Sequence, residues 1–264
     1  MGRSMRKKNL IIVLLLAQLQ VYCQSKNLHQ FWNEYAFTKD LTSQWAVEID
    51  LGLRATNAPS DSHIFRNIAQ LYMRPWVHYY PYQRWKLSVF YAYFQNKLVD
   101  ELNQEKGLEL RSALQCTYIL LDKNRFKLNL RGRFEDRHIK KGYGNFETIK
   151  RLRFQMKVVY PLNALMVNKM PMNVFVSEEF FFNAKSSVSR DYFFDRNRLT
   201  LGLRNPIDSY LDIELSYVNE TTPTVKDQYL SALQFNLIFN NFFANIGKSF
   251  KRTKTFSGNV VNES

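Results

Sequence analysis

The sequence predicts an all-β protein, an antiparallel up-and-down transmembrane β-barrel of about 10–12 strands with a polar, arginine-rich lumen. Three observations carry this prediction. Charged and apolar residues alternate along one segment after another, several of these segments reach eleven residues or more, and tight turns alternate with longer polar loops. Strands of that length cross a bilayer at a tilt, whereas strands of soluble proteins are usually about 5–6 residues long.

Alternation is clearest over residues 125–137, where the odd positions are charged or polar. The even positions from 126 to 134 are apolar or glycine, namely Phe126, Leu128, Leu130, Gly132 and Phe134. Successive side chains of a strand point to opposite faces, so this run has one charged face and one apolar face. On a helix the same residues would surround the whole cylinder with charge. We therefore predict a strand, joined by a tight turn to a preceding strand over 108–120.

The same pattern predicts the other strands in chain order. Alternation is weak over 28–37, which is a candidate first strand. Clearer strands are predicted at 44–54, 65–78, 85–94, 108–120, 125–137, 151–160, 172–183, 196–204, 211–217 and 229–239. These ten satisfy the even number expected of bacterial barrels. If there are ten strands, residues 28–37 lie partly in the lumen or at an edge of the sheet. Alternatively, residues 28–37 form an eleventh strand and residues 240–248 form a twelfth.

The N-terminus has the order of a secretory signal, with basic residues, the apolar run Leu10 to Leu16 and a polar exit. That run is too short to span a bilayer as a helix. We predict cleavage by ordinary signal peptidase near Cys23, because Gln20 to Tyr22 fit a lipidation box poorly. The expected organisation is a signal peptide at 1–23, an N-terminal segment at 24–43, the barrel at 44–239 and a polar tail at 240–264.

Charge and cysteine content limit what the exported chain can be. The signal carries four of the positive charges in a formal net charge of +14, so about +10 remains by the same count. Cys116 is then the single cysteine, and no intrachain disulfide is possible. We expect no nucleic-acid partner, because the basic residues are spread over alternate positions of many strands.

The predicted inner face is strongly basic, with sixteen Lys or Arg residues against seven Asp or Glu. An arginine ladder with interspersed carboxylates suits a narrow, wet lumen crossed by fork-shaped ion pairs. This favours a barrel in the bacterial outer membrane over a soluble sandwich or a lipocalin-like barrel. The predicted lumen charge network contains Glu48, Arg54, Arg111, Arg131, Arg133, Glu135, Arg137, Arg151, Arg153, Glu179, Arg196, Arg198 and Glu214.

One segment leaves its register open. Glu178 and Glu179 lie on opposite faces of the strand predicted over 172–183, so either register places a carboxylate among phenylalanines.

No motif for catalysis or for metal binding is present. The four histidines are far apart in sequence and show no metal-ligand spacing, and Ser88, Ser112 and Ser177 have no evident base partner. We expect a non-enzymatic protein without a cofactor. His78 is expected on the inner face, as a hydrogen-bonded lumen residue and not as a catalyst.

Two functions fit the arginine-rich face. In the first, the arginines form a charge-paired filling of an envelope structural or binding protein. In the second, they line a small, anion-preferring, porin-like channel. A barrel of this size has little free lumen, which favours the first. A membrane-embedded hydrolase is a third and less favoured function. Expected partners are membrane lipid and, on the binding hypothesis, anionic solutes or lipopolysaccharide.

Several strings resemble a known family. They are Arg131-x-Arg133-x-Glu135-x-Arg137, Arg151-x-Arg153, Glu178-Glu179-Phe180, Asp195-Arg196-Asn197-Arg198-Leu199 and Glu214-Leu215-Ser216-Tyr217. They look like the uncharacterised envelope proteins grouped as domain-of-unknown-function family 2490, over residues 31–239. The resemblance implies an outer-membrane barrel and no assigned activity.

Overall fold

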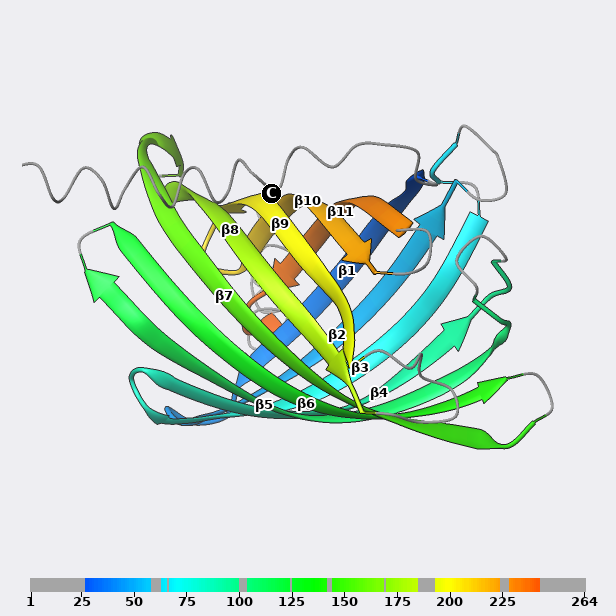
Figure 1. Ribbon diagram of the computed structural model, residues 1–264. Helices are drawn as coiled ribbons and strands as arrows, with labels where there is room; N and C mark the ends of the chain where they lie inside the picture. The colour runs from blue at the N-terminus through cyan, green and yellow to red at the C-terminus, as the bar shows by residue number, and fades with distance from the viewer. Residues whose placement is uncertain are drawn as a thin grey trace, which may run out of the picture.

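The computed structural model describes residues 27–57, 63–65, 67–99, 104–123, 125–141, 144–168, 170–184, 193–223 and 228–242. These residues form a closed barrel of eleven strongly tilted strands (Figure 1). The strands are β1 (Asn27–Asp40), β2 (Trp45–Thr56), β3 (Asn67–Tyr82), β4 (Trp85–Asn96), β5 (Gly107–Lys123), β6 (Phe126–Lys141), β7 (Phe146–Val167), β8 (Met170–Asn183), β9 (Phe194–Pro206), β10 (Leu211–Thr222) and β11 (Gln228–Phe239). The predicted all-β barrel is confirmed.

The closure of the barrel differs from the expected antiparallel pattern. Neighbouring strands from β1 to β11 pair antiparallel, but β1 and β11 pair in parallel, with Asn27 opposite Tyr229 and Phe37 opposite Phe239. We call the pairing of β1 with β11 the seam. An odd number of strands requires a parallel seam, because the last strand then runs in the same direction as the first. Eleven strands lie within the predicted range of 10–12, but the described strands do not have the even number expected of bacterial barrels.

Residues 27–40 form a complete strand of the wall, not a segment inside the lumen or at an open edge. β1 has partners on both sides, β2 and β11, so its backbone donors and acceptors are used in two ladders. In the proposed twelfth strand, Asn240 and Asn241 form a turn, and residues 243–248 lie outside the described residues.

The connections distinguish the two ends of the barrel. Connections of two to four residues join β1 to β2, β3 to β4, β5 to β6, β7 to β8 and β9 to β10; we call this the turn end. The other connections have four to ten residues and define the loop end. In Figure 1 the turn end lies to the left and the loop end to the right. β1 begins at the loop end, and β11 finishes at the turn end.

Alternation of side chains is nearly perfect in β4. Leu87, Val89, Tyr91 and Tyr93 point outward and are 41–55% exposed, while Ser88, Phe90, Ala92 and Phe94 point inward and are at most 5% exposed. The barrel therefore has an apolar outer face and an inner face of polar groups mixed with aromatic rings. No helix in the described ranges is long and apolar enough to cross a membrane.

Two inward glycines make room for aromatic rings on the neighbouring strand. Gly52 is paired with Tyr72 of β3, and Gly202 is paired with Phe175 of β8. A Cβ atom at either glycine would overlap the facing ring. These glycines therefore let each ring pack directly against the barrel wall.

Candidate functional site

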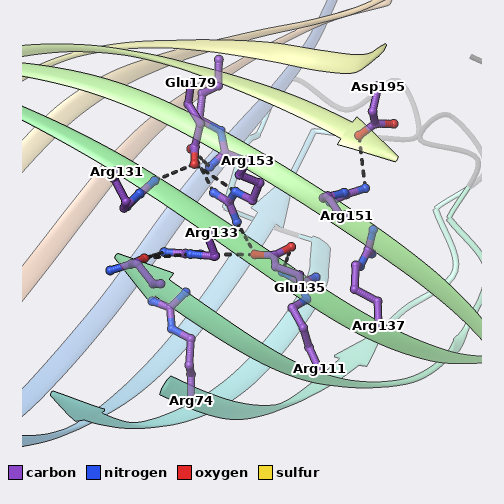
Figure 2. A network of polar contacts seen from close by, with 12 residues as sticks. Arg74, Arg111, Arg131, Arg133, Glu135, Arg137, Arg151, Arg153, Glu179 and Asp195 are labelled. Atoms are coloured by element: carbon purple, nitrogen blue, oxygen red, sulfur yellow. Dashed lines mark hydrogen bonds and ion pairs between the residues drawn. The ribbon is translucent and has the colours of Figure 1, made fainter. Parts of the chain in front are cut away.

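Arg153 lies at the centre of the lumen and joins two buried carboxylates. Its Nε and Nη2 atoms each donate to Glu179 at 2.9 Å, one to each oxygen, and its Nη1 donates to Glu135 at 2.7 Å. A guanidinium that meets a carboxylate with two parallel donors forms one of the strongest ion pairs in proteins. Figure 2 shows Arg153 between the two carboxylates.

Glu135 has two further cationic partners. Nη1 of Arg133 donates to its Oε1 atom at 3.3 Å, and Nη1 of Arg111 lies 3.7 Å from its Oε2 atom. Glu135 is 0% exposed, so its charge is balanced by these guanidinium groups and not by bulk water. Its partners Arg111, Arg133 and Arg153 come from β5, β6 and β7, so the carboxylate forms ion pairs with side chains of three strands (Figure 2).

Glu179 has the same role on the other side of Arg153. Nη2 of Arg131 donates to its Oε1 atom at 2.6 Å, and Nη1 of Arg198 lies 3.8 Å from its Oε2 atom. Glu179 lies on β8, and it therefore forms ion pairs with arginines of β6, β7 and β9. Its position also settles the register of β8: Glu179 is buried at 1% exposure, while Glu178 lies on the outer face and accepts from Nδ2 of Asn197 at 2.9 Å.

The network continues at Glu109 of β5. This carboxylate, 1% exposed, accepts from Nε and Nη2 of Arg111 at 2.9 and 2.7 Å. It also accepts from Nε and Nη2 of Arg137 at 2.6 and 3.0 Å. Because Arg111 also faces Glu135, Glu109 is connected to the centre of the network.

Glu220 of β10 and Asp195 of β9 extend the network in the other direction. Glu220 accepts from Nη2 of Arg198 at 2.5 Å and from Nη1 of Arg196 at 3.0 Å. Asp195 accepts from Nε of Arg196 at 2.9 Å and lies 3.1 Å from Nη2 of Arg151.

One connected network thus spans β5 to β10. Its members are Glu109, Arg111, Arg131, Arg133, Glu135, Arg137, Arg151, Arg153, Glu179, Asp195, Arg196, Arg198 and Glu220. It contains eight arginines and five carboxylates, which leaves three positive charges in excess. Burying a charge costs several kcal/mol, and shared, well-aligned ion pairs offset that cost.

Aromatic rings support the excess cations. The guanidinium of Arg133 lies 5.3 Å from the ring centroid of Trp76 and 5.5 Å from that of Phe90, and that of Arg153 lies 4.4 Å from Phe181. Ring faces attract cations most strongly when water is excluded. The aromatic rings of the lumen therefore help to stabilise these buried cations.

A second, smaller cluster lies on β1, β2 and β3. Arg74 donates from Nε to Asp50 at 2.7 Å and from Nη2 to Glu34 at 2.9 Å. The indole of Trp76 donates to Asp50 at 2.7 Å, and the hydroxyl of Tyr72 donates to Glu34. Glu34 was not among the predicted site residues, because the alternation of β1 is weak.

The structure does not join three of the predicted residues to this network. Arg54 forms no ion pair within the described part of the chain, and its guanidinium lies 4.2 Å from the centroid of Trp32. Glu214 accepts from Nδ2 of Asn236 at 3.1 Å, and Nζ of Lys157 is 4.0 Å away. The third residue, Glu48, lies beside His78.

Glu48, His78 and Ser88 form a chain of contacts that sequence reasoning missed. Nδ1 of His78 lies 2.9 Å from Oγ of Ser88, its direct partner across β3 and β4, and Nε2 lies 3.5 Å from Oε2 of Glu48. The expectation that Ser88 lacks a base partner is corrected, because strand pairing brings together residues that share no motif. His78 and Ser88 are each 3% exposed, and neither lines the lumen cavities described below.

Two network members, Asp195 and Glu220, were not predicted to face the lumen, for local reasons. The register shifts between Phe181 and Phe182 of β8, so that Phe181 faces Arg196 and Phe182 faces Phe194. Asp195 is the extra residue of this bulge, and its Oδ2 atom lies 3.1 Å from Nη2 of Arg151. Glu220 continues the inward face of β10 beyond residue 217, where the predicted strand ends, and a longer strand would have included it.

Two cavities in the lumen are lined by described residues. The loop-end cavity has a volume of about 340 Å³, and the turn-end cavity has a volume of about 390 Å³. Six residues line both and lie at their boundary: Trp32, Arg54, Tyr72, Arg74, Arg153 and Arg198. Within the described ranges, no group of three or more His, Cys, Asp and Glu residues is placed to hold a metal ion.

A closed β-barrel with an interior cross-linked by buried arginine–carboxylate pairs is the class that the fold and the lumen define. Over residues 29–230 the chain matches the family described as "Protein of unknown function (DUF2490)", and it belongs to that family. The resemblance seen in its arginine-rich strings is thereby confirmed. No curated protein and no solved structure matches the chain.

Proposed function

We propose that this chain is an outer-membrane β-barrel with a filled lumen, which acts as a structural or binding protein of the cell envelope. The observation that carries the proposal is the ion-pair network, which crosses the lumen from β5 to β10 and divides the free space into two cavities. Solute flow through the barrel would require these paired side chains to separate.

The outer face supports a membrane location. Large apolar side chains point outward around the barrel, among them Leu114, Tyr91 and Phe154, which are 62%, 55% and 52% exposed. Soluble monomers rarely expose a continuous apolar surface of this extent. The strands have 12 to 22 residues, more than the roughly 9–11 that a tilted membrane strand needs. The predicted signal peptide at 1–23 lies outside the described residues.

A non-enzymatic role is part of the proposal. Ser88, His78 and Glu48 have the residue types of a hydrolase triad, but a substrate carbonyl must approach the serine oxygen. Ser88 and His78 are almost completely buried between strands, and the lumen cavities lie elsewhere. Their hydrogen bond pairs Nδ1 of His78 with Oγ of Ser88 inside the barrel, which is a structural role.

One observation favours an anion-preferring channel as a second candidate function. Nine basic and three acidic residues line the loop-end cavity, and eight basic and three acidic residues line the turn-end cavity. Rings of Arg and Lys favour anions over cations in a pore.

Reconstitution into planar bilayers tests the proposal and separates the two candidates. A filled lumen predicts little or no steady conductance. Any conductance that appears should prefer anions and fall in Arg131→Gln and Arg133→Gln, but not in the control Lys123→Gln, whose side chain is exposed at the turn end. Large, cation-preferring openings would contradict both candidates. In cells, the protein should fractionate with outer membranes and migrate differently on gels when it is not boiled.

A further inference from the structure

The turn-end cavity differs from the loop-end cavity in the hydrogen bonding of the residues that line it. Three residues that line it each have a buried side-chain atom without a hydrogen-bond partner in the described structure: Nε of Arg131, Oδ1 of Asn129 and Oγ of Ser216. None of the buried unpartnered atoms among the described residues belongs to a residue that lines the loop-end cavity. Buried polar groups are normally paired, so a cluster of unpaired ones beside a cavity indicates a place for a polar guest.

The strand register brings two of these atoms close to a lysine. Asn129 and Arg131 are two residues apart on β6 and share its inward face, and Lys157 of β7 lies directly opposite Asn129. Side chains that face each other across paired strands are about 5 Å apart at Cβ, and diagonal neighbours are about 7–8 Å apart. The amide, the guanidinium and the ammonium therefore form a compact triangle on one wall of the cavity.

The cations of this triangle have unused donors. Arg131 uses Nη2 for Glu179, but its Nε donates to no group. The ammonium of Lys157 lies 3.7 Å from the ring centroid of Phe175, and its nearest carboxylate, on Glu214, is 4.0 Å away. The side chains of Arg131 and Lys157 are 21% and 28% exposed, so a water-sized probe reaches both.

Positive charge is in excess around the whole cavity, where eight basic residues face three acidic ones. One of the basic residues, Lys86, forms no ion pair within the described part of the chain. By contrast, the arginines beside the loop-end cavity are engaged by Glu109 and Glu220. A multivalent anion bound in the turn-end cavity would offset the excess positive charge there.

We propose that the turn-end cavity binds a phosphate monoester whose carrier bears hydroxyl groups. The phosphate oxygens accept from Nε of Arg131 and from the ammonium of Lys157, while Oδ1 of Asn129 and Oγ of Ser216 take hydroxyl groups of the ligand. A volume of about 390 Å³ exceeds that of inorganic phosphate and suits a ligand of sugar-phosphate size. This inference deepens the proposed binding role and rests on the filled lumen of that proposal.

Calorimetric titration of the purified, folded full-length protein in detergent tests the site. The probes are glucose 6-phosphate, inorganic phosphate, sulfate, glucose and short-chain lysophosphatidic acid, whose glycerol keeps one free hydroxyl group. We expect saturable binding of glucose 6-phosphate with one site per chain, weaker binding of inorganic phosphate and of sulfate, which offer no carrier hydroxyl groups to Asn129 and Ser216, and no binding of glucose. Lysophosphatidic acid distinguishes a lipid headgroup from a soluble ester as the natural source of the phosphate.

Matched variants locate the site. Lys157→Gln should weaken glucose 6-phosphate binding about tenfold or more, the effect of one charge-assisted hydrogen bond, and Lys157→Arg should restore most of it. Lys140→Gln makes the same change at the loop-end cavity and should leave the affinity within about twofold. Unboiled gel mobility and thermal unfolding verify that each variant is folded.

The inference is overturned if neither glucose 6-phosphate nor lysophosphatidic acid binds saturably, or if Lys140→Gln weakens binding as much as Lys157→Gln does. Inorganic phosphate binding as tight as that of glucose 6-phosphate would overturn the assignment of carrier hydroxyl groups to Asn129 and Ser216. These outcomes are independent of conductance, so silent bilayers without phosphate binding would overturn this inference and leave the proposed function intact.

Discussion

Glu135 shows how single residues hold the lumen together. Its carboxylate is inaccessible to solvent and is surrounded by guanidinium groups of Arg111, Arg133 and Arg153. Each of those arginines has another partner, but none can move to bulk water when the carboxylate is lost. The energetic importance of Glu135 therefore comes from the charges that it would leave unpaired.

Glu135→Gln should lower the free energy of unfolding by about 3–5 kcal/mol, because breaking one partner of a buried ion pair leaves an uncompensated charge. Urea unfolding of the purified protein measures the change. Glu178→Gln is the matched control: its carboxylate lies on the outer face and accepts one hydrogen bond from Asn197, which the glutamine oxygen can also accept, so the change should cost less than about 1 kcal/mol. Equal stability of the two variants would show that water hydrates the arginines and that the network is not structural.

Gly202 is the second residue whose role the structure defines, because the ring of Phe175 occupies the space of its missing side chain. Gly202→Ala should destabilise the barrel by about 1–3 kcal/mol, the usual cost of overpacking. Gly132→Ala is the control, since its new methyl group would meet only Phe154, at 3.9 Å. Thermal unfolding compares the two, and a neutral Gly202→Ala would show that Phe175 can move without cost.

At the level of elements, alternation was enough to predict which residues face the lumen. In β6 the odd residues from Asn129 to Arg137 face inward, and Leu130 and Phe134 face outward at 37% and 40% exposure. The pattern is reliable because a shift by one residue would reverse every side chain of the strand.

Alternation fails at bulges, which sequence patterns do not reveal. Between Arg54 and Ala55 of β2 the register also shifts, so that Ala55 faces Ile68 and Ala69 is turned inward at 1% exposure. Alternation over 65–78 would put Ala69 in phase with Met73, which faces outward at 48% exposure, and the bulge reverses the direction of Ala69. A bulge is specified by contacts with the neighbouring strand, which a single segment does not contain.

Leu130→Arg tests the outer face of β6. If Leu130 meets lipid, an arginine near the middle of the bilayer should cost about 2–4 kcal/mol and reduce insertion, while the inward change Asn129→Ser should be mild. Both effects can be measured as the fraction of protein that folds into lipid vesicles and resists denaturation in unboiled gel samples. Equal damage from both changes would instead indicate a soluble protein with its core on one of these faces.

At the level of the whole molecule, the number of strands was the feature least accessible to prediction. Each segment shows its own alternation, but no segment shows which partner closes the barrel. The sequence pattern therefore left ten, eleven and twelve strands open, and the parallel pairing of β1 with β11 excludes the even numbers for the described chain. The likeness to a family without assigned activity could not supply the role either.

A disulfide across the seam tests this closure. Tyr35 and Leu237 are paired in the register of β1 and β11, and neighbouring strands lie about 4.8 Å apart, within reach of a disulfide. Tyr35→Cys with Leu237→Cys, in a Cys116→Ser background, should cross-link readily under mild oxidation and change mobility on non-reducing gels. Tyr35→Cys with Leu215→Cys is the control, because β10 is not a neighbour of β1. Cross-linking of the control pair alone would contradict the parallel seam.

The seam also has a consequence for the order in which the protein folds. All other strand pairs join neighbours along the chain, but the seam joins residues as far apart as Thr38 and Phe239, which are separated by 201 positions. Closing so long a stretch of chain costs more entropy than forming a hairpin, so we expect the ten antiparallel pairings to form first. Until the seam closes, β1 and β11 each present a row of unpaired backbone groups to solvent, and these two edges are where a second copy of the nascent chain could add.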